Sequence, residues 1–185
     1  MQRRGFILTG GRSSRLGQDK ALLPVSGGTL AEHLAGIIAR TAGSATLVGP
    51  PARYAHLSIP CVPDLRPGLG PLSGIEAALS QTETDHNLIL ACDLPGIDDS
   101  LLNSLFSKAE SSVADCVCVR DAAGMIHPLC AVYRRSCLGP VQAALDSGKL
   151  RLLSLLDTID TVYVDTNQPL ANINTLAEWN SFAAR

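Results

Sequence analysis

Short apolar segments of strand length alternate along this chain with longer segments that have helical periodicity. Apolar residues at positions 30, 34, 37 and 38 recur with the spacing of one helix face. Strands of about 4–6 residues alternating with helices predict βαβ units around a largely parallel sheet. Strands are expected at 6–8, 45–48, 61–62, 87–91, 115–119, 127–133 and 161–164. Helices are expected at 30–40, 72–79, 100–109 and 141–145, and a last one is expected to open at 175 and to include Trp179 and Phe182.

Helix starts are marked in the sequence by capping residues. Thr29 is followed by Glu32, and Thr175 is followed by Glu178, which is the spacing of a capping box. The residues 98–100, Asp-Asp-Ser, are suited to cap the helix that follows them. Prolines at positions 50, 51, 63, 67 and 71 punctuate a loop-rich stretch rather than a domain linker, so one domain over residues 1–185 is expected.

The composition favours a folded protein with an aliphatic core. Hydrophobic residues make up 46% of the 185 residues and charged residues 17%, which argues against disorder. The net charge of -2 and an aromatic content of only 4% give no support for nucleic-acid binding. No apolar run approaches the ~20 residues of a membrane span, so no membrane association is expected. The six cysteines form no CxxC pair and most lie in apolar runs, which predicts buried free thiols and a cytoplasmic location.

A glycine-rich loop follows the first predicted strand directly. Residues 9–20 read Thr-Gly-Gly-Arg-Ser-Ser-Arg-Leu-Gly-Gln-Asp-Lys, so glycines stand where a ligand needs close backbone approach and cations where its charge needs neutralising. The loop matches neither GxxxxGK[ST] nor GxGxxG. It therefore predicts a site for a phosphate-rich ligand, with Lys20 on the phosphates. A solvated surface lysine is the competing interpretation of Lys20, and Arg12 and Arg15 could merely flank the loop.

Polar residues also follow the other predicted strands, at the edge where ligands of open parallel sheets bind. Asp64 and Arg66 follow the strand at 61–62, and Asp93 follows the strand at 87–91. An acid at the end of a buried strand can bind Mg²⁺ together with substrate phosphates, and this interpretation of Asp93 is favoured over a cap before Pro95. Asp64 could contact a ribose hydroxyl or a metal, or could be a turn residue after a proline.

The C-terminal segment and the histidines carry weaker signals. Asn172 and Asn174 bracket one residue before the last helix, where two amides could recognise a heterocycle edge or could simply form a turn. His33 is expected on the surface, and His127 is expected to be structural although it could reach the ligand. No GxSxG and no cysteine–histidine pair supports nucleophilic hydrolysis.

Several motifs together resemble a known family. Residues 8–20 are similar to the LAGG-x-S-x-RMG-x-DK signature of nucleotidyltransferases, and residues 68–74 are similar to a GPLAG segment. Residues 91–95 resemble CDMP, residues 127–129 match HPL, and residues 170–175 resemble NINTPEE. Over nearly the whole chain, the sequence resembles the molybdenum cofactor guanylyltransferase family more than a generic sugar nucleotidyltransferase.

The resemblance implies a single Rossmann-like three-layer α/β domain with a mostly parallel sheet of nucleotidyltransferase type. It implies nucleotide and Mg²⁺ binding in the N-terminal half and pterin binding in the C-terminal half. The catalytic residues that it implies are Lys20, Asp93 and Arg15, with Asp93 also the metal ligand. The nucleotide-binding residues that it implies are Leu8, Thr9, Gly10, Gly11, Lys20, Asp64 and Asp93. The substrate-binding residues that it implies are Asn172, Asn174, Gly70 and Gly74.

The reaction that the resemblance implies is transfer of GMP from GTP to molybdopterin or its molybdenum form, with release of pyrophosphate. GTP and molybdopterin are then the substrates, Mg²⁺ is the cofactor, and molybdoenzyme maturation proteins are compatible partners. The same chemistry with CTP stays open, as does a non-catalytic nucleotide-binding subunit, which would need the glycine loop but not Asp93. A sugar-phosphate nucleotidyltransferase is a weaker alternative because it leaves Asn172 and Asn174 without a purpose.

Overall fold

A seven-stranded sheet forms the centre of the described part of the chain. The computed structural model describes residues 2–9, 18–25, 27–167, 170, 172–173 and 175–183. The strands, in sheet order, are β5 (Cys61–Val62), β4 (Ala45–Val48), β1 (Arg3–Leu8), β6 (His86–Ala91), β8 (Ile126–Tyr133), β7 (Cys116–Arg120) and β9 (Thr161–Asp165). Only β8 runs antiparallel to its neighbours, while β5, β4, β1 and β6 form a continuous parallel block.

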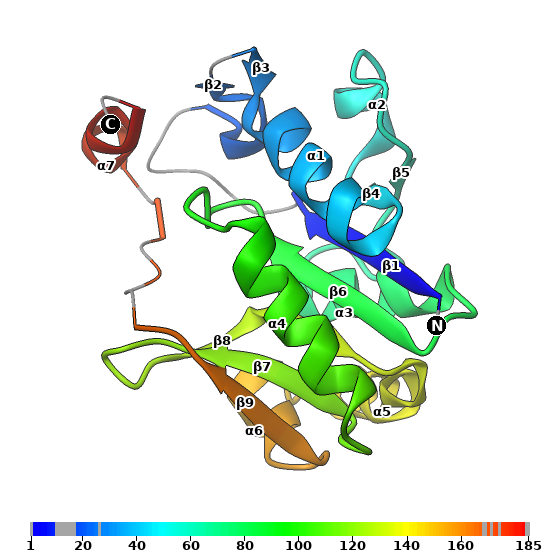
Figure 1. Cartoon of the computed structure of the whole chain (residues 1–185). Coiled ribbons are helices and arrows are strands. Elements are labelled where there is room, and N and C mark those ends of the chain that lie inside the picture. Colours follow the sequence, from blue (N-terminus) through cyan, green and yellow to red (C-terminus); the bar gives the residue numbers. More distant parts are fainter. Residues whose placement is uncertain are drawn as a thin grey trace.

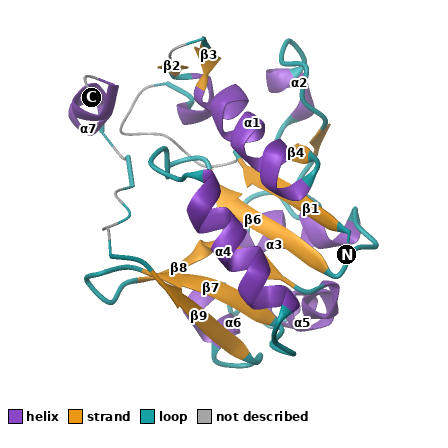
Figure 2. Ribbon diagram, viewed as in Figure 1, coloured by secondary structure: helices purple, strands orange, loops and turns teal. Residues whose placement is uncertain are grey.

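Helices cover both faces of this sheet, as Figures 1 and 2 show. One face carries α1 (Leu30–Ala42) and α4 (Asp99–Glu110); the other carries α3 (Pro71–Ser80), α5 (Leu138–Asp146) and α6 (Leu152–Leu156). Successive residues of β1 point to opposite faces of the sheet. Ile7 packs with α1 and α4, whereas Phe6 and Leu8 pack with α3 and α5. The predicted three-layer, mostly parallel α/β fold is therefore confirmed.

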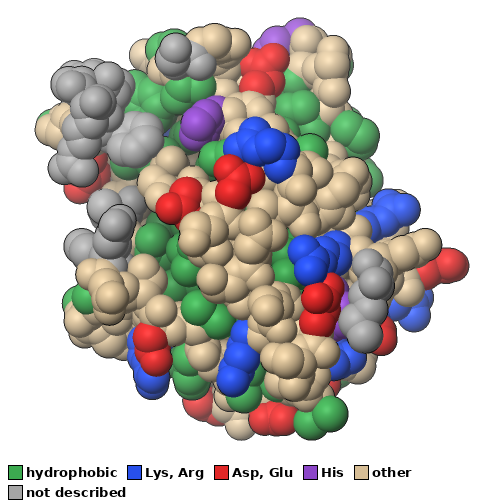
Figure 3. Space-filling model, in the orientation of Figure 1, with side chains coloured by type: hydrophobic (Ala, Val, Ile, Leu, Met, Phe, Trp, Pro, Cys, Tyr) green, Lys and Arg blue, Asp and Glu red, His purple; other side chains and the backbone are tan. Residues whose placement is uncertain are grey.

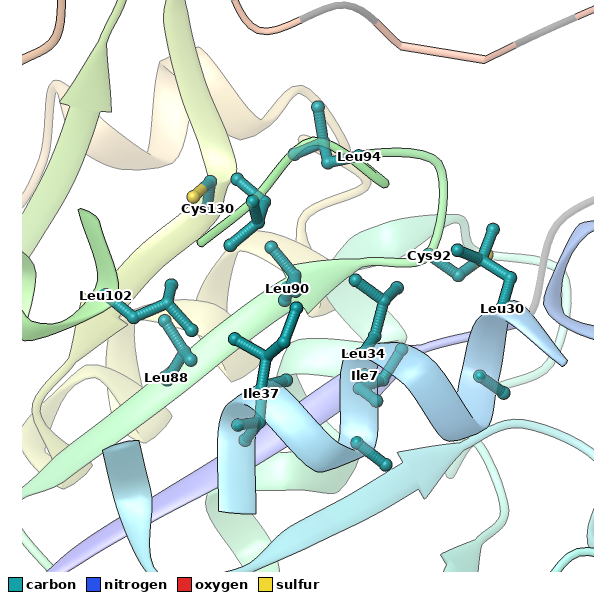
Figure 4. Packing of buried hydrophobic residues seen from close by; sticks show 14 of the residues in the cluster. Ile7, Leu30, Leu34, Ile37, Leu88, Leu90, Cys92, Leu94, Leu102 and Cys130 are labelled. Carbon is teal, nitrogen blue, oxygen red and sulfur yellow. The ribbon is translucent and has the colours of Figure 1, made fainter. Parts of the chain in front are cut away.

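Helix α1 shows how the sequence pattern becomes packing. Thr29 and Glu32 form the predicted capping box: the Glu32 amide donates to Thr29 Oγ1 (3.3 Å) and the Thr29 amide donates to Glu32 Oε2 (2.8 Å). Gly43 ends the helix in a left-handed conformation. Figure 4 shows Leu30, Leu34 and Ile37 of this helix turned toward the strand residues Ile7, Leu88 and Leu90.

The remaining elements are short or terminal. The predicted C-terminal helix is α7 (Leu176–Ala183), and its capping box is present, because the Glu178 amide donates to Thr175 Oγ1 (3.2 Å). The sequence did not predict α2 (Pro51–Tyr54), α6, the 3-10 turns η1 (Lys20–Leu22) and η2 (Arg135–Cys137), or the small antiparallel pair of β2 (Pro24–Val25) and β3 (Gly28–Thr29). Each is only two to five residues long, which is too short for periodicity to register.

The cysteines are free and mostly buried. Five of the six are buried, and Cys61 on β5 is half-buried. Burial raises the pKa of the Cys92 thiol to about 12, so this thiol is neutral near pH 7 and is a poor nucleophile. The prediction that these residues serve as small apolar side chains is confirmed for the five buried ones.

Charges on the visible surface are mixed in sign. Figure 3 shows basic and acidic side chains standing beside one another over α1 and α4. One such pair is Arg40 with Asp99, whose Nη2 and Oδ2 atoms are 2.8 Å apart. Within the described residues, the helices are too short or too polar to span a bilayer.

Candidate functional site

The carboxyl ends of three parallel strands meet at one level of the sheet. Leu8 of β1 is aligned with Val48 of β4 on one side and with Ala91 of β6 on the other. The Thr9 amide and hydroxyl both donate to the Val48 carbonyl (3.0 and 2.9 Å). Both the side chain and the amide of Thr9 are thus hydrogen-bonded within the protein. The predicted nucleotide contacts Gly10 and Gly11, and the loop arginines Arg12 and Arg15, lie outside the described residues.

The structure brings two of the predicted residues together at this edge. Lys20 Nζ lies 3.7 Å from Asp93 Oδ2, although one residue follows the glycine loop and the other follows β6. The two side chains are 15% and 23% exposed, so the pair is shielded on most sides and open on one. A cation beside a partly open carboxylate can bind a polyanion and a divalent metal side by side.

Asp19 fixes the position of Lys20 by capping the turn that begins there. Its carboxylate accepts from the Ala21 amide (3.1 Å) and so caps η1, the turn that begins at Lys20. The Tyr54 hydroxyl donates to the same carboxylate (2.8 Å) and lies 3.3 Å from the Thr9 carbonyl. Burial raises the pKa of Tyr54, which keeps the phenol protonated and able to donate. Arg53 adds an ion pair to Asp19 at 3.2 Å.

Tyr54 and Arg53 are site-supporting residues that the sequence did not reveal. Both belong to α2, a single turn within the stretch that the prolines predict to be rich in loops. The available signal was Pro50-Pro51, because a proline at the first position of a helix is preorganised for it.

Asp93 is held in place by its two buried neighbours in the sequence and by a hydrogen bond to its backbone carbonyl. Cys92 and Leu94 on either side are buried in the layer under α1 and α4, as Figure 4 shows. The Ile173 amide donates to the Asp93 carbonyl (2.9 Å), and Ile173 is itself buried in this layer together with Trp179. The C-terminal segment is thereby fastened beside Asp93.

The bond from Ile173 to Asp93 concerns one of the predicted asparagines, because Asn172 is the adjacent residue in the chain. Asn172 precedes Ile173 and is exposed, so its amide is available to a ligand. Asn174, the second predicted asparagine, lies outside the described residues.

Asp64 and the two glycines predicted for substrate binding lie around the start of α3. Gly70 is exposed, has φ +76°, and precedes Pro71 at the start of the helix. Gly74 is buried, and a Cβ added to it would lie 3.1 Å from Leu8 Cδ2 and 3.6 Å from Asp64 Oδ1. Gly74 therefore lets α3 approach the end of β1. Partial burial raises the pKa of the Asp64 carboxyl.

Arg66, which was expected at this edge, and His127, which was expected to be structural, both make their contacts within the protein. Arg66 pairs with Glu76 and Asp146 rather than facing Lys20 and Asp93. His127 is buried, and its Nε2 lies 3.0 Å from Asp121 Oδ2, which anchors the β7–β8 turn. His33 is exposed on α1, as predicted.

The structure thus has a mostly parallel α/β sheet with a lysine and a carboxylate at its carboxyl edge, which is the edge where ligands of such sheets bind. The comparison of sequences gives the family: residues 5–162 match the MobA-like NTP transferase domain. The chain belongs to this family of nucleotidyltransferases, which confirms the resemblance seen in the sequence.

Relatives and structural neighbours agree with this assignment. A protein of Flavobacterium johnsoniae named "Probable molybdenum cofactor guanylyltransferase" is 33% identical over 95% of this chain and 93% of its own. One of the same name from Carboxydothermus hydrogenoformans is 34% identical over 94% of this chain and 91% of its own. The fold matches the crystal structure of molybdopterin-guanine dinucleotide biosynthesis protein A from Archaeoglobus fulgidus. That match has a TM-score of 0.83 and 22% identity, and it covers 98% of this chain and 97% of the other.

Proposed function

We propose that this nucleotidyltransferase acts in molybdenum cofactor biosynthesis and transfers GMP from GTP to molybdopterin or its molybdenum form. The names of the relatives favour this acceptor and this nucleotide. The observation that carries the proposal is the Lys20–Asp93 pair at the open edge of the sheet, beside the segment that bears Asn172.

The reaction that we propose is an in-line displacement. The terminal phosphate of the pterin attacks the α-phosphorus of GTP, the bond to the β-phosphate oxygen breaks, and pyrophosphate leaves. A phosphate monoester is already ionised near neutral pH, so the attacking group needs no general base. The task of the protein is then to align two anions and to neutralise their charge.

The residues at this edge fit a magnesium ion. Mg²⁺ is commonly held by one or two carboxylates plus substrate phosphates, and Asp93 offers a partly open carboxylate of this kind. No group of three or more histidine, cysteine, aspartate or glutamate side chains that could hold a metal ion occurs among the described residues. When bound, the ion would withdraw negative charge from the phosphate oxygens.

The other predicted residues keep their proposed roles. Lys20, with Arg15, would stabilise the departing pyrophosphate. We assign the nucleotide to the N-terminal half, with contacts from Leu8, Thr9, Gly10, Gly11 and Asp64. We assign the pterin to the C-terminal half, through Asn172 and Asn174, with further contacts from Gly70 and Gly74 at the start of α3.

Incubation with molybdopterin, Mg²⁺ and each nucleoside triphosphate in turn, followed by mass analysis of the products, tests the proposed function. We expect the guanine dinucleotide to form and to dominate when GTP and CTP compete. A dominant cytosine dinucleotide would overturn the choice of nucleotide. Nucleotide binding without any dinucleotide product would indicate a non-catalytic subunit.

Replacement of Lys20 by methionine keeps the aliphatic stem and removes the charge. We expect kcat to fall by about 10²- to 10³-fold, the loss typical when one electrostatic contact to the transition state is removed. Pyrophosphate release is the measurement. Lys108→Met on α4, where the lysine is exposed, is the matched control and should keep normal kcat. Normal turnover in Lys20→Met would remove Lys20 from the proposed phosphate site.

A further inference from the structure

Glu76 is a carboxylate placed where the fold otherwise buries apolar groups. It lies on α3 and is only 2% exposed, and its neighbours Ile75 and Ala77 on the helix are also buried. Its Oε1 lies 3.1 Å from Arg66 Nη2, but its Oε2 is buried with no hydrogen-bond partner among the residues that the structure describes. An unsatisfied buried oxygen is destabilising, so packing alone does not explain a glutamate here.

Arg66 links Glu76 to the loop that follows β5. This loop, residues 63–70, leaves the sheet after Val62 and enters α3 at Pro71. The Arg66 amide donates to Ser73 Oγ (3.0 Å), and its guanidinium pairs with Glu76 on α3 and with Asp146 at the end of α5. Arg66 therefore ties the loop to two helices of the layer behind the sheet.

Asp64 lies in the same loop, two residues before Arg66. In the described part of the chain, no hydrogen bond or ion pair joins its carboxylate to another residue. Its Oδ1 lies near the place where a side chain on Gly74 would begin. The position of the Asp64 carboxylate thus depends on where the loop is held, and the contacts of Arg66 hold it.

We propose that Glu76 is a positioning residue for nucleotide binding: through Arg66 it fixes the loop 63–70 and so places the Asp64 carboxylate at the edge of the sheet. The inference rests on the proposed function, in which Asp64 contacts the nucleotide. It adds two residues, Glu76 and Arg66, that touch neither nucleotide nor acceptor.

The two acids that pair with Arg66 differ in their exposure to solvent, and this difference provides a control. The Glu76 side chain is 3% exposed, whereas the Asp146 side chain is 67% exposed. Exposed ion pairs contribute little, because water competes for both groups. Asp146→Asn therefore removes a charge from the same guanidinium without releasing the loop, and it is the matched control for changes at Glu76.

The experiment compares the affinity for Mg²⁺–GTP, measured by isothermal titration calorimetry, in the wild type and in Glu76→Gln, Glu76→Leu and Asp146→Asn. We expect Glu76→Leu to weaken GTP binding by about tenfold or more. Glu76→Gln keeps an acceptor for Arg66 and should stay within about threefold of the wild type, and Asp146→Asn within about twofold.

A double-mutant cycle separates positioning from general damage. If Glu76 acts through Asp64, Glu76→Leu should add little to the loss already caused by Asp64→Asn, since coupled residues are not additive. Fully additive losses, or unchanged GTP affinity in folded Glu76→Leu, would overturn the inference.

Folding of these variants is checked by thermal unfolding. Should Glu76→Leu not fold, the double change Arg66→Met with Glu76→Leu replaces the whole ion pair by apolar groups and leaves no unpaired buried charge. The affinity of this double variant for GTP should be about tenfold or more below that of the wild type. Wild-type affinity would again overturn the inference. Failure of the wild type to bind GTP would instead contradict the proposed function, so the two failures are distinct.

Discussion

Asp93→Asn is expected to abolish turnover, with kcat lowered by at least about a hundredfold. A bound metal supplies several kcal/mol of charge stabilisation, and each ~1.4 kcal/mol corresponds to a factor of ten. Asparagine has nearly the same shape as aspartate, and the Asp93 backbone would keep its bond from the Ile173 amide. The loss should therefore come from the missing charge rather than from misfolding. Pyrophosphate release from GTP and molybdopterin measures it.

The control for Asp93→Asn is Asp99→Asn. Asp99 also lies beyond β6 but is exposed, and it pairs with Arg40 on the surface of α1. This variant should keep normal pyrophosphate release. Near-normal release from Asp93→Asn would contradict the assignment of the metal to Asp93.

Gly5→Ala is expected to lower the free energy of unfolding by about 3 kcal/mol, near the upper end of what overpacking usually costs. A Cβ at this position of β1 would lie 2.0 Å from Ile38 Cγ2 and 3.2 Å from the Ser44 carbonyl oxygen. Ile38 is fully buried and β-branched, so it has little freedom to turn away. Helix α1 would have to move away from the sheet. Urea denaturation of the purified variant measures the change.

Gly36→Ala is the matched control, because the same methyl group should act in the opposite direction there. Gly36 lies inside α1, and apart from the helix's own backbone a Cβ on it would meet, among the described residues, just Arg40 Nη1 at 3.7 Å. Alanine restricts the unfolded chain and favours the helix, so stability should rise by roughly 0.5–1 kcal/mol. Equal effects of the two substitutions would contradict this account of the close approach at Gly5.

The sequence predicted the regular elements well because their patterns are local. The face of α1 that includes Leu34 and Ile38 is visible from spacing alone, and the Thr29–Glu32 box marks where the helix starts. The single turn of α2 has neither length nor periodicity, so Tyr54 and its support of Asp19 could not be predicted.

The site was predictable only in outline. Parallel strands bring their carboxyl ends to one edge, which is why Lys20 and Asp93 could be expected near each other. The direction of a side chain in an irregular loop cannot be predicted from the spacing of apolar residues. Arg66 was expected among the cations of this edge, and in the structure it turns toward Glu76 instead.

The burial of five of the six cysteines means that thiol alkylation can report how often the folded protein opens. A thiol reagent reacts with thiolate, and burial both hides the five inner cysteines and keeps them protonated. Cys61, half-buried on the edge strand β5, is the thiol that the folded molecule leaves partly reachable. Modification of the inner five requires strands and helices to separate, so the rate at which they are alkylated counts unfolding events under native conditions.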